Sequence, residues 1–181
     1  MNSNKWDDKY RDAIAPGNVC HVLSEYSHLL PGSGSSLDIA CGLGANALFL
    51  AEKGLQSFAY DSSSVALQKL SQFAEQRGLR VSSELRDVEQ DLLGEQSFDV
   101  IVVSYFLYRP LCEVLVRALN PGGFLFYQTF TEAAAANGGP SNKKFLLKPD
   151  ELLSLFSDLS VQVYQENSTV PDQALFVGKK L

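Results

Sequence analysis

The stretch LDIACGLGANALFL, residues 37–50, changes from the pattern of a strand to the pattern of a helix across two glycines. Leu37, Ile39 and Ala40 are typical of the end of a buried strand, whereas the apolar residues after Gly44 recur at helical spacing. Glycine lets the backbone turn sharply and approach a ligand closely, and the following helix presents free N–H groups at its start. The segment therefore predicts a ligand site between a strand and a helix.

The composition is that of an ordinary globular protein. The chain has 181 residues, of which 45% are hydrophobic and 20% are charged, enough to bury a sizeable core. The net charge of -6 comes without a strongly basic stretch, which disfavours a nucleic-acid partner because phosphates need a basic face. No apolar run approaches the length of a membrane span, and the polar, acidic start of the chain predicts no signal peptide.

The cysteines indicate a reducing compartment. Cys20, Cys41 and Cys112 are far apart and odd in number, and they form no metal-ligand spacing with His21 or His28. We therefore expect free thiols, a cytoplasmic setting and no bound metal.

Strands and helices alternate along the chain. Helices are expected over residues 5–14, 19–30, 45–53, 63–77, 110–119 and 149–156, and strands over 35–40, 55–61, 79–87, 97–106, 124–130, 160–166 and 173–180. Expected helix starts are Asn18, Ser62 or Ser63, and Pro149; NPGG, residues 120–123, is an expected turn. The alternation predicts an α/β fold, doubly wound around a mainly parallel seven-stranded sheet with a closing antiparallel strand. We expect one domain over residues 1–181, with 1–34 as a helical cap segment, 35–181 as the core and 131–148 as a loop.

Three acidic residues are expected to meet at one edge of this sheet. Asp38, Asp61 and Asp87 lie near the ends of successive strands, and parallel strands bring those ends together beside the glycine turn. Asp61 follows Gly42 by about twenty residues, the separation of an acid that accepts hydrogen bonds from ribose hydroxyls. Asp99 begins its strand and is expected at the opposite edge, as a structural or solvated residue. An adenosine-bearing cofactor fits this edge, although a dinucleotide or a turn without a ligand would need the same glycines.

Several segments, in order, resemble the motifs of class I S-adenosylmethionine-dependent methyltransferases. They are LDIACGLGANALFLAEKG, FAYDSS, LRDVEQD, FDVIVVSYFLYRP and ALNPGGFLFYQTF, and they extend over essentially the whole chain. The opening WDDKYRD and the late LLKPDELLSLF further resemble the small methyltransferases of the tellurite-resistance type. The resemblance implies a Rossmann-like methyltransferase fold with S-adenosylmethionine as cofactor, S-adenosylhomocysteine as its product and no metal.

The same resemblance assigns cofactor-binding roles. It places the methionine part among Asp38, Ala40, Gly42 and Gly44, the ribose at Asp61 with Ser62 beside it, the adenine at Asp87 and the backbone of Val88, and the methyl side at Ser104. Ala40 stands where many class I enzymes have glycine. Ala45 stands where the tellurite-resistance group often has arginine, so the basis for an anion contact there is missing.

Fewer signals mark the acceptor side. The opening segment carries Trp6, Tyr10 and Arg11 and is either a helix packed on the sheet or a lid over the cofactor. Arg109 follows the fourth strand at the ligand edge, as a substrate contact or a solvent residue, and the 131–148 loop is a surface loop or a substrate lid. The substrate-side candidates are Tyr10, Arg11, Ser104 and Arg109.

The sequence thus predicts a methyltransferase that acts on a small molecule. Methyl transfer is an in-line displacement that needs alignment and exclusion of water. No residue can be recognised from the sequence as a general base, and this favours an acceptor with a soft or anionic nucleophile, such as a thiol or a chalcogen oxyanion. Two alternatives remain open: a catalytically silent methyltransferase-like binding subunit, and an NAD-dependent oxidoreductase, for which LRDVEQD and NPGGFLFY have no required role.

Overall fold

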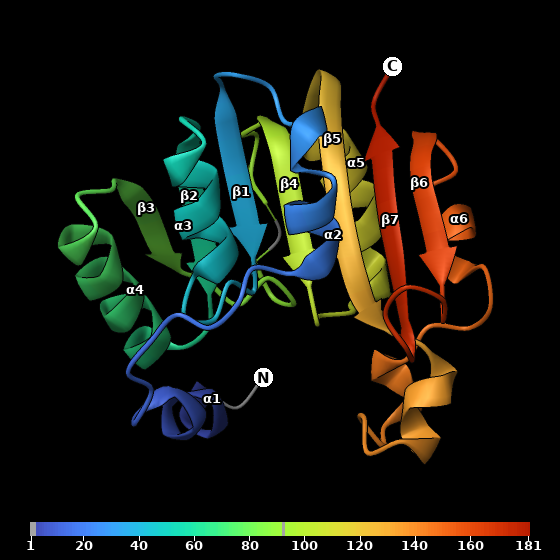
Figure 1. Ribbon diagram of the computed structural model, residues 1–181, viewed down its shortest axis with the longest axis horizontal. Helices are drawn as coiled ribbons and strands as arrows, with labels where there is room; N and C mark the ends of the chain where they lie inside the picture. Colours follow the sequence, from blue (N-terminus) through green and yellow to red (C-terminus); the bar gives the residue numbers. More distant parts are fainter. Residues whose placement is uncertain (1–2, 92) are drawn as a thin grey trace.

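The computed structural model describes residues 3–91 and 93–181. Within them, seven strands form one sheet: β1 (Ser35–Ile39), β2 (Gln56–Asp61), β3 (Val81–Leu85), β4 (Phe98–Ser104), β5 (Leu119–Phe130), β6 (Ser160–Glu166) and β7 (Gln173–Lys179). The strand order is β3-β2-β1-β4-β5-β7-β6 (Figure 1). Neighbours from β3 to β5 pair in parallel, and β7 is antiparallel to both β5 and β6. The predicted doubly wound, mainly parallel α/β fold is confirmed.

Helices cover both faces of the sheet (Figure 1). The α-helices are α1 (Ser3–Tyr10), α2 (His21–Glu25), α3 (Ala45–Glu52), α4 (Ser64–Gln76), α5 (Cys112–Ala118) and α6 (Glu151–Leu155). Short 3-10 turns are η1 (Ser27–Leu29), η2 (Arg109–Leu111), η3 (Glu132–Ala136) and η4 (Lys143–Phe145). Along β4, Val100 and Val102 pack with α2 and α3, whereas Ile101 and Val103 pack with α5 and α6. This alternation buries both faces, as expected for an all-apolar parallel strand.

The N-terminal helices are shorter than the sequence predicts. The first ends at Tyr10 rather than at residue 14, and the segment predicted over 19–30 is α2 followed by η1. The N-cap of α2 is Cys20, not Asn18. The reason is tertiary: the buried side chain of Gln128 accepts the free N–H of Val22 at 2.8 Å, which takes the place of a local side-chain cap.

Two further boundaries were predicted wrongly. The NPGG segment lies inside β5 instead of forming a separate turn, because Gly122 N–H donates to the Lys180 carbonyl and Lys180 N–H donates to that of Gly123. Pro149 precedes α6 instead of opening it. The N-cap is Asp150, whose φ of 57° turns the chain into the helix.

Candidate active site

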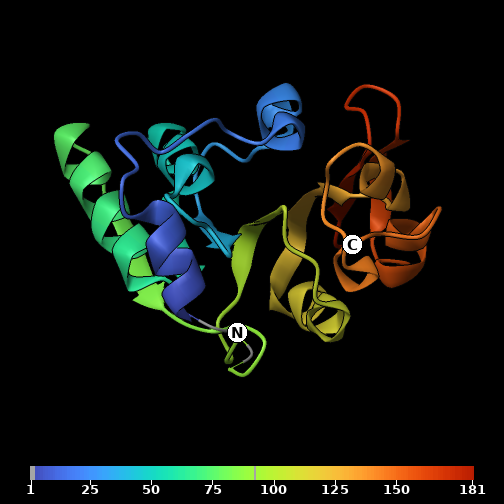
Figure 2. The ribbon, with the colours of Figure 1, turned by 90° about the horizontal axis from the view of Figure 1, so that it is seen from below.

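A cavity of about 240 Å³ opens at the carboxyl ends of the parallel strands. Its walls come from the chain just after β1, β2, β3 and β4, and from the N-terminal segment. Figure 2 shows α1 lying alongside α4 at this end of the sheet. The cavity therefore stands where an open, doubly wound sheet binds its ligand.

The glycine turn forms the floor of the cavity. Ala40, Gly42 and Gly44 have φ values of 51°, 53° and 79°, a region that glycine enters easily and other residues seldom enter. A Cβ on Gly44 would lie 2.3 Å from Leu70 of α4, so that position has no room for a side chain. Ala40 adopts the same left-handed conformation with a methyl group, at the position where the class I pattern commonly has glycine.

Asp61, at the end of β2, holds this turn in place. Its Oδ2 accepts the N–H of Gly42 at 2.7 Å, and its Oδ1 accepts the N–H of Ser63 at 2.8 Å. The side chain lines the cavity, and burial raises the pKa of the carboxyl above its ordinary value. Each carboxylate oxygen keeps a lone pair beyond those bonds, so a ligand hydroxyl can still donate to it.

A buried amide connects the ends of β1 and β4. Asn46 accepts the N–H of Cys20 at 2.9 Å through Oδ1, which fixes the orientation of its amide. Its Nδ2 donates to Ser104 Oγ at 3.0 Å and to Asp38 Oδ1 at 3.4 Å. Since Ser104 Oγ is the acceptor of that bond, its own proton is left to point elsewhere. Within residues 3–91 and 93–181 no side chain or carbonyl accepts that proton, and Ser104 lines the cavity.

Asp38 lies behind the cavity rather than in its wall. The residue is fully buried, and its Oδ2 accepts the N–H of Ala47 at 3.1 Å. Burial raises the pKa of this carboxyl to about 7. Asp38 and Gly44 thus support the turn, while the other residues of the predicted cofactor set line the cavity: Ala40, Gly42, Asp61, Ser62, Asp87, Val88 and Ser104.

The N-terminal helix crosses the mouth of the cavity. Asp7 accepts from Ser63 Oγ at 2.6 Å and from the N–H of Val65 at 3.3 Å, which ties α1 to the start of α4. These hydrogen bonds lower the pKa of the Asp7 carboxyl. Trp6 and Tyr10 line the cavity with their rings stacked 6.1 Å apart, and a Cβ on Gly42 would lie 2.8 Å from the Tyr10 hydroxyl. The geometry is that of a cover over the glycine turn.

The end of the cavity after β3 is polar. Asp87 lines it and accepts the N–H of Glu89 at 3.1 Å. Its neighbour Arg86 also lines the cavity; it pairs with Glu84 at 2.7 Å and lies over the ring of Tyr60. The sequence analysis missed Arg86, although its place beside Asp87 in LRDVEQD was a usable signal.

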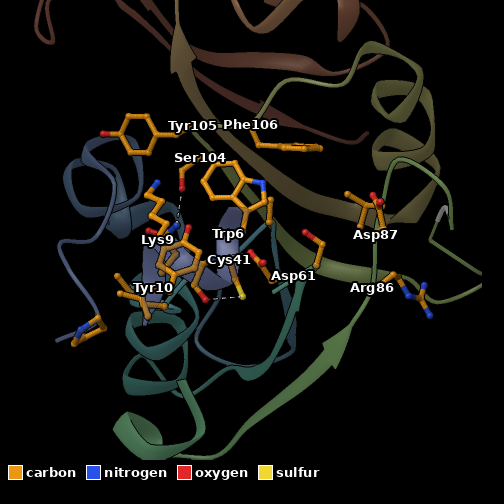
Figure 3. A pocket seen from close by; sticks show the side chains of 18 of the residues that line it. Trp6, Lys9, Tyr10, Cys41, Asp61, Arg86, Asp87, Ser104, Tyr105 and Phe106 are labelled. Atoms are coloured by element: carbon orange, nitrogen blue, oxygen red, sulfur yellow. Dashed lines mark hydrogen bonds between the residues drawn. The ribbon is translucent and has the colours of Figure 1, made fainter. Parts of the chain in front are cut away.

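Lys9, Tyr105 and Phe106 are further lining residues that the sequence analysis did not single out (Figure 3). Lys9 is a surface residue of α1, and its Nζ lies 4.6 Å from the centre of the Trp6 ring. Tyr105 and Phe106 directly follow β4, so their position at the ligand edge was the signal available.

The two arginines predicted on the acceptor side do not line the cavity. Arg11 pairs with Asp8 at 2.6 Å on the surface. Arg109 donates to both carboxylate oxygens of Glu151, at 2.6 and 2.8 Å, and to the carbonyls of Lys144 and Leu146. Arg109 therefore anchors the end of the 131–148 loop, and a role for either arginine in acceptor binding stays a prediction.

Asp99 lies at the opposite edge of the sheet. It accepts the N–H of Ser35 at 2.8 Å, at the start of β1, and the side-chain amide of Asn120 at 2.9 Å. Across the part of the chain that the structure describes, no three His, Cys, Asp or Glu side chains gather in a way that would hold a metal ion. No helix in that part is long and apolar enough to cross a bilayer.

Comparison with known proteins agrees with this geometry. Residues 37–123 match the family model of a methyltransferase domain. A 2-heptyl-1-hydroxyquinolin-4(1H)-one methyltransferase of Mycobacteroides abscessus is 30% identical over 109 residues, 56% of this chain and 48% of that protein. The chain thus spans about half the length of this curated relative.

Solved structures share the whole fold. TehB from Haemophilus influenzae superposes with a TM-score of 0.76 at 20% identity, over 99% of this chain and 67% of that one. A structure from work on the conversion of a disulfide bond into a thioacetal group during echinomycin biosynthesis also has a TM-score of 0.76, at 22% identity, over 99% and 92% of the two chains. Residues 37–123 of this chain thus match a methyltransferase domain, and the chain as a whole is similar in fold to TehB.

Proposed function

We propose that this protein binds S-adenosylmethionine in the cavity and transfers its methyl group to a small molecule with a soft or anionic nucleophile. The observation that carries the proposal is the convergence of Gly42, Asp61, Asp87 and Ser104 on one cavity at the carboxyl ends of β1 to β4. In this convergence each residue comes from a different strand end or turn. If the glycines served only the geometry of the turn, the fold would not need Asp61, Asp87 and Ser104 to line the same cavity.

The side chains present fit such a cofactor. Asp61 offers carboxylate lone pairs to ribose hydroxyls, and Asp87 lines the cavity beyond β3, on the side where the adenine would lie. Asp61 places a carboxylate beside the turn, which favours a cationic sulfonium and an ammonium group. When bound, S-adenosylmethionine supplies an electrophilic methyl group carried on a positively charged sulfur.

The chain's own residues then have limited tasks. Trp6 and Tyr10 cover the turn and exclude water from the cavity. An in-line methyl transfer chiefly needs this exclusion of water and the alignment of the two reactants. Cys41 lines the cavity, but burial raises the pKa of its thiol well above the ordinary value, so the thiol stays protonated. No histidine lines the cavity among the described residues. The acceptor therefore has to arrive as a good nucleophile, a thiolate or an acidic oxygen.

The relatives support this class of acceptor. The Mycobacteroides abscessus protein is named for a hydroxyquinolone acceptor, and the echinomycin structure concerns sulfur chemistry. A thiol or a chalcogen oxyanion is the acceptor type that we propose for this chain.

Isothermal titration calorimetry tests the proposal. We expect saturable binding of S-adenosylmethionine and S-adenosylhomocysteine and no binding of NAD. Binding of NAD without a response to either sulfur compound would overturn the proposal in favour of an oxidoreductase. Binding of the sulfur compounds without methyl transfer to any thiol, phenol or chalcogen oxyanion would instead indicate a silent binding subunit.

A further inference from the structure

Three consecutive residues, the last of β4 and the two that follow it, line the cavity, which an extended strand does not allow. Successive residues of a strand point to opposite faces, so Ser104 and Tyr105 would ordinarily diverge. Tyr105 has a φ of 55°, in the left-handed region, and this breaks the alternation. Ser104, Tyr105 and Phe106 consequently lie along one side of the cavity, across from Tyr10 and Cys41 (Figure 3).

The left-handed conformation of Tyr105 is held by a neighbouring strand. The N–H of Tyr105 donates to the carbonyl of Gln128 on β5 at 2.8 Å, and the Gln128 side-chain amide donates to the Tyr105 hydroxyl at 3.2 Å. Gln128 is fully buried, and its own orientation is set because Oε1 accepts the N–H of Val22. Such a conformation costs about 1–3 kcal/mol in a residue other than glycine, and it persists where the surroundings enforce it.

The ring that this conformation presents is large and half exposed. Tyr105 is 52% exposed although it is aromatic, and its ring packs at a tilt of 40° against Phe130, with ring centroids 5.4 Å apart. Phe106 and Trp6 add further aromatic surface around the same cavity. Next to the ring, Ser104 has a hydroxyl proton directed away from Asn46 and free to donate to a ligand. A flat apolar surface therefore lies beside one hydrogen-bond donor.

We propose that the acceptor is a flat aromatic molecule whose ring lies against Tyr105 and whose nucleophilic sulfur or oxygen accepts a hydrogen bond from Ser104. This inference rests on the proposed function and narrows its substrate class. Aromatic rings gain from offset or edge contacts with one another, whereas a small inorganic oxyanion gains nothing from such a wall. Tyr105 is then a specificity-determining residue.

The reaction balances simply for an aromatic thiol. A lone pair of the acceptor sulfur forms the new bond to the methyl carbon, and the carbon–sulfonium bond breaks with its electron pair kept by the cofactor sulfur. The acceptor's proton leaves to solvent before the transfer, so the products are an aromatic methyl thioether, S-adenosylhomocysteine and one proton.

The test uses two thiols of similar shape, benzyl mercaptan and cyclohexylmethyl mercaptan, with sodium selenite as an inorganic acceptor. For the unmodified chain we expect kcat/KM, expressed per thiolate because the two thiols differ in acidity, to be roughly two- to tenfold higher for the phenyl-bearing thiol than for the aliphatic one, the ratio that one aromatic contact supports. Tyr105→Asn, which keeps a residue tolerant of the left-handed region, should bring this ratio to about one. Tyr105→Phe should preserve it, and both variants should bind S-adenosylhomocysteine as the unmodified chain does.

Equal kcat/KM values for the two thiols in the unmodified chain, or a ratio that survives Tyr105→Asn, would overturn the inference. So would a protein that binds S-adenosylmethionine and methylates selenite alone, or neither thiol. In each of those cases the proposed cofactor site stands. Failure to bind S-adenosylmethionine at all would overturn the proposed function itself.

Discussion

The N–H of Gly42 donates to the carboxylate of Asp61 across 2.7 Å, so the residue that ends β2 holds the turn that follows β1. The same carboxylate accepts the N–H of Ser63, whose hydroxyl donates to Asp7 of α1. One side chain thus connects the floor of the cavity to its cover. Replacing Asp61 should therefore weaken the binding of any ligand that lies between the floor and the cover.

Asp61→Asn should weaken the binding of S-adenosylmethionine by about 2–4 kcal/mol, because charge-assisted hydrogen bonds are lost in a sheltered site. Calorimetry measures the change. Asp99→Asn is the matched control, since Asp99 also accepts a backbone N–H but lies at the opposite edge of the sheet. Equal losses in the two folded variants would contradict the placement of the cofactor.

Asn46→Ala should lower the free energy of unfolding by about 2–4 kcal/mol, because it leaves the buried N–H of Cys20 without its acceptor and removes two further bonds. Urea unfolding measures this. Asn142 also accepts one backbone N–H, that of Lys144, but at an exposed site. Asn142→Ala should therefore lower the free energy of unfolding much less. A similar decrease in both variants would show that the buried Asn46 amide contributes no more to stability than an exposed one.

Stability should fall as the pH rises from 5 to 8. Burial raises the pKa of Asp38 from 3.8 to about 7, so the folded state holds this proton more tightly than the unfolded state. The protonated Asp38 carboxyl contributes its full stabilisation below pH ~4, and this contribution is lost as the pH rises through ~7. Between pH 5 and 8 the loss in the free energy of unfolding is on the order of 2 kcal/mol. The raised pKa of Asp61 acts in the same direction.

Urea unfolding of the ligand-free protein at several pH values checks this slope, and Asp38→Asn should flatten it. The carboxyls of Asp7, Asp99 and Glu151 have lowered pKa values and lose their contribution only in acid, outside the window. A slope between pH 5 and 8 that is the same in the variant would assign it to another group.

Arg109→Ala should release the 131–148 loop without changing cofactor affinity. The guanidinium holds the carbonyls of Lys144 and Leu146 and the carboxylate of Glu151, and none of these lines the cavity. Faster tryptic cleavage after Lys143 or Lys144 is the expected readout. Arg11→Ala, which removes only a surface ion pair, should leave the cleavage rate as it was. If both variants are cleaved at the parental rate, the loop is held by other contacts.

The sheet and its ligand edge could be predicted because their signals are local. Apolar runs mark the strands, and the distance from Gly42 to Asp61 is set by one helix and one strand. The ends of α2 could not be predicted in the same way, since they depend on the side chains of Gln128 and Asn46 from distant segments.

The acceptor side of the cavity was harder to predict from the sequence for a related reason. Arg109 stands at the ligand edge in sequence, but Glu151, 42 residues later, draws its side chain away. Tyr105 has a positive φ, which tyrosine seldom adopts, so its residue type gave no indication of this backbone conformation. Both outcomes follow from long-range contacts that spacing along the chain does not reveal.

Trp6 is the chain's single tryptophan, and it lies on α1 in the wall of the cavity. Its indole emission is therefore an optical signal native to the site, free of background from any other tryptophan. A ligand that enters beneath α1 changes the polarity and the quenching around this ring. Stopped-flow fluorescence of the unlabelled protein can thus time the arrival of a ligand in the cavity.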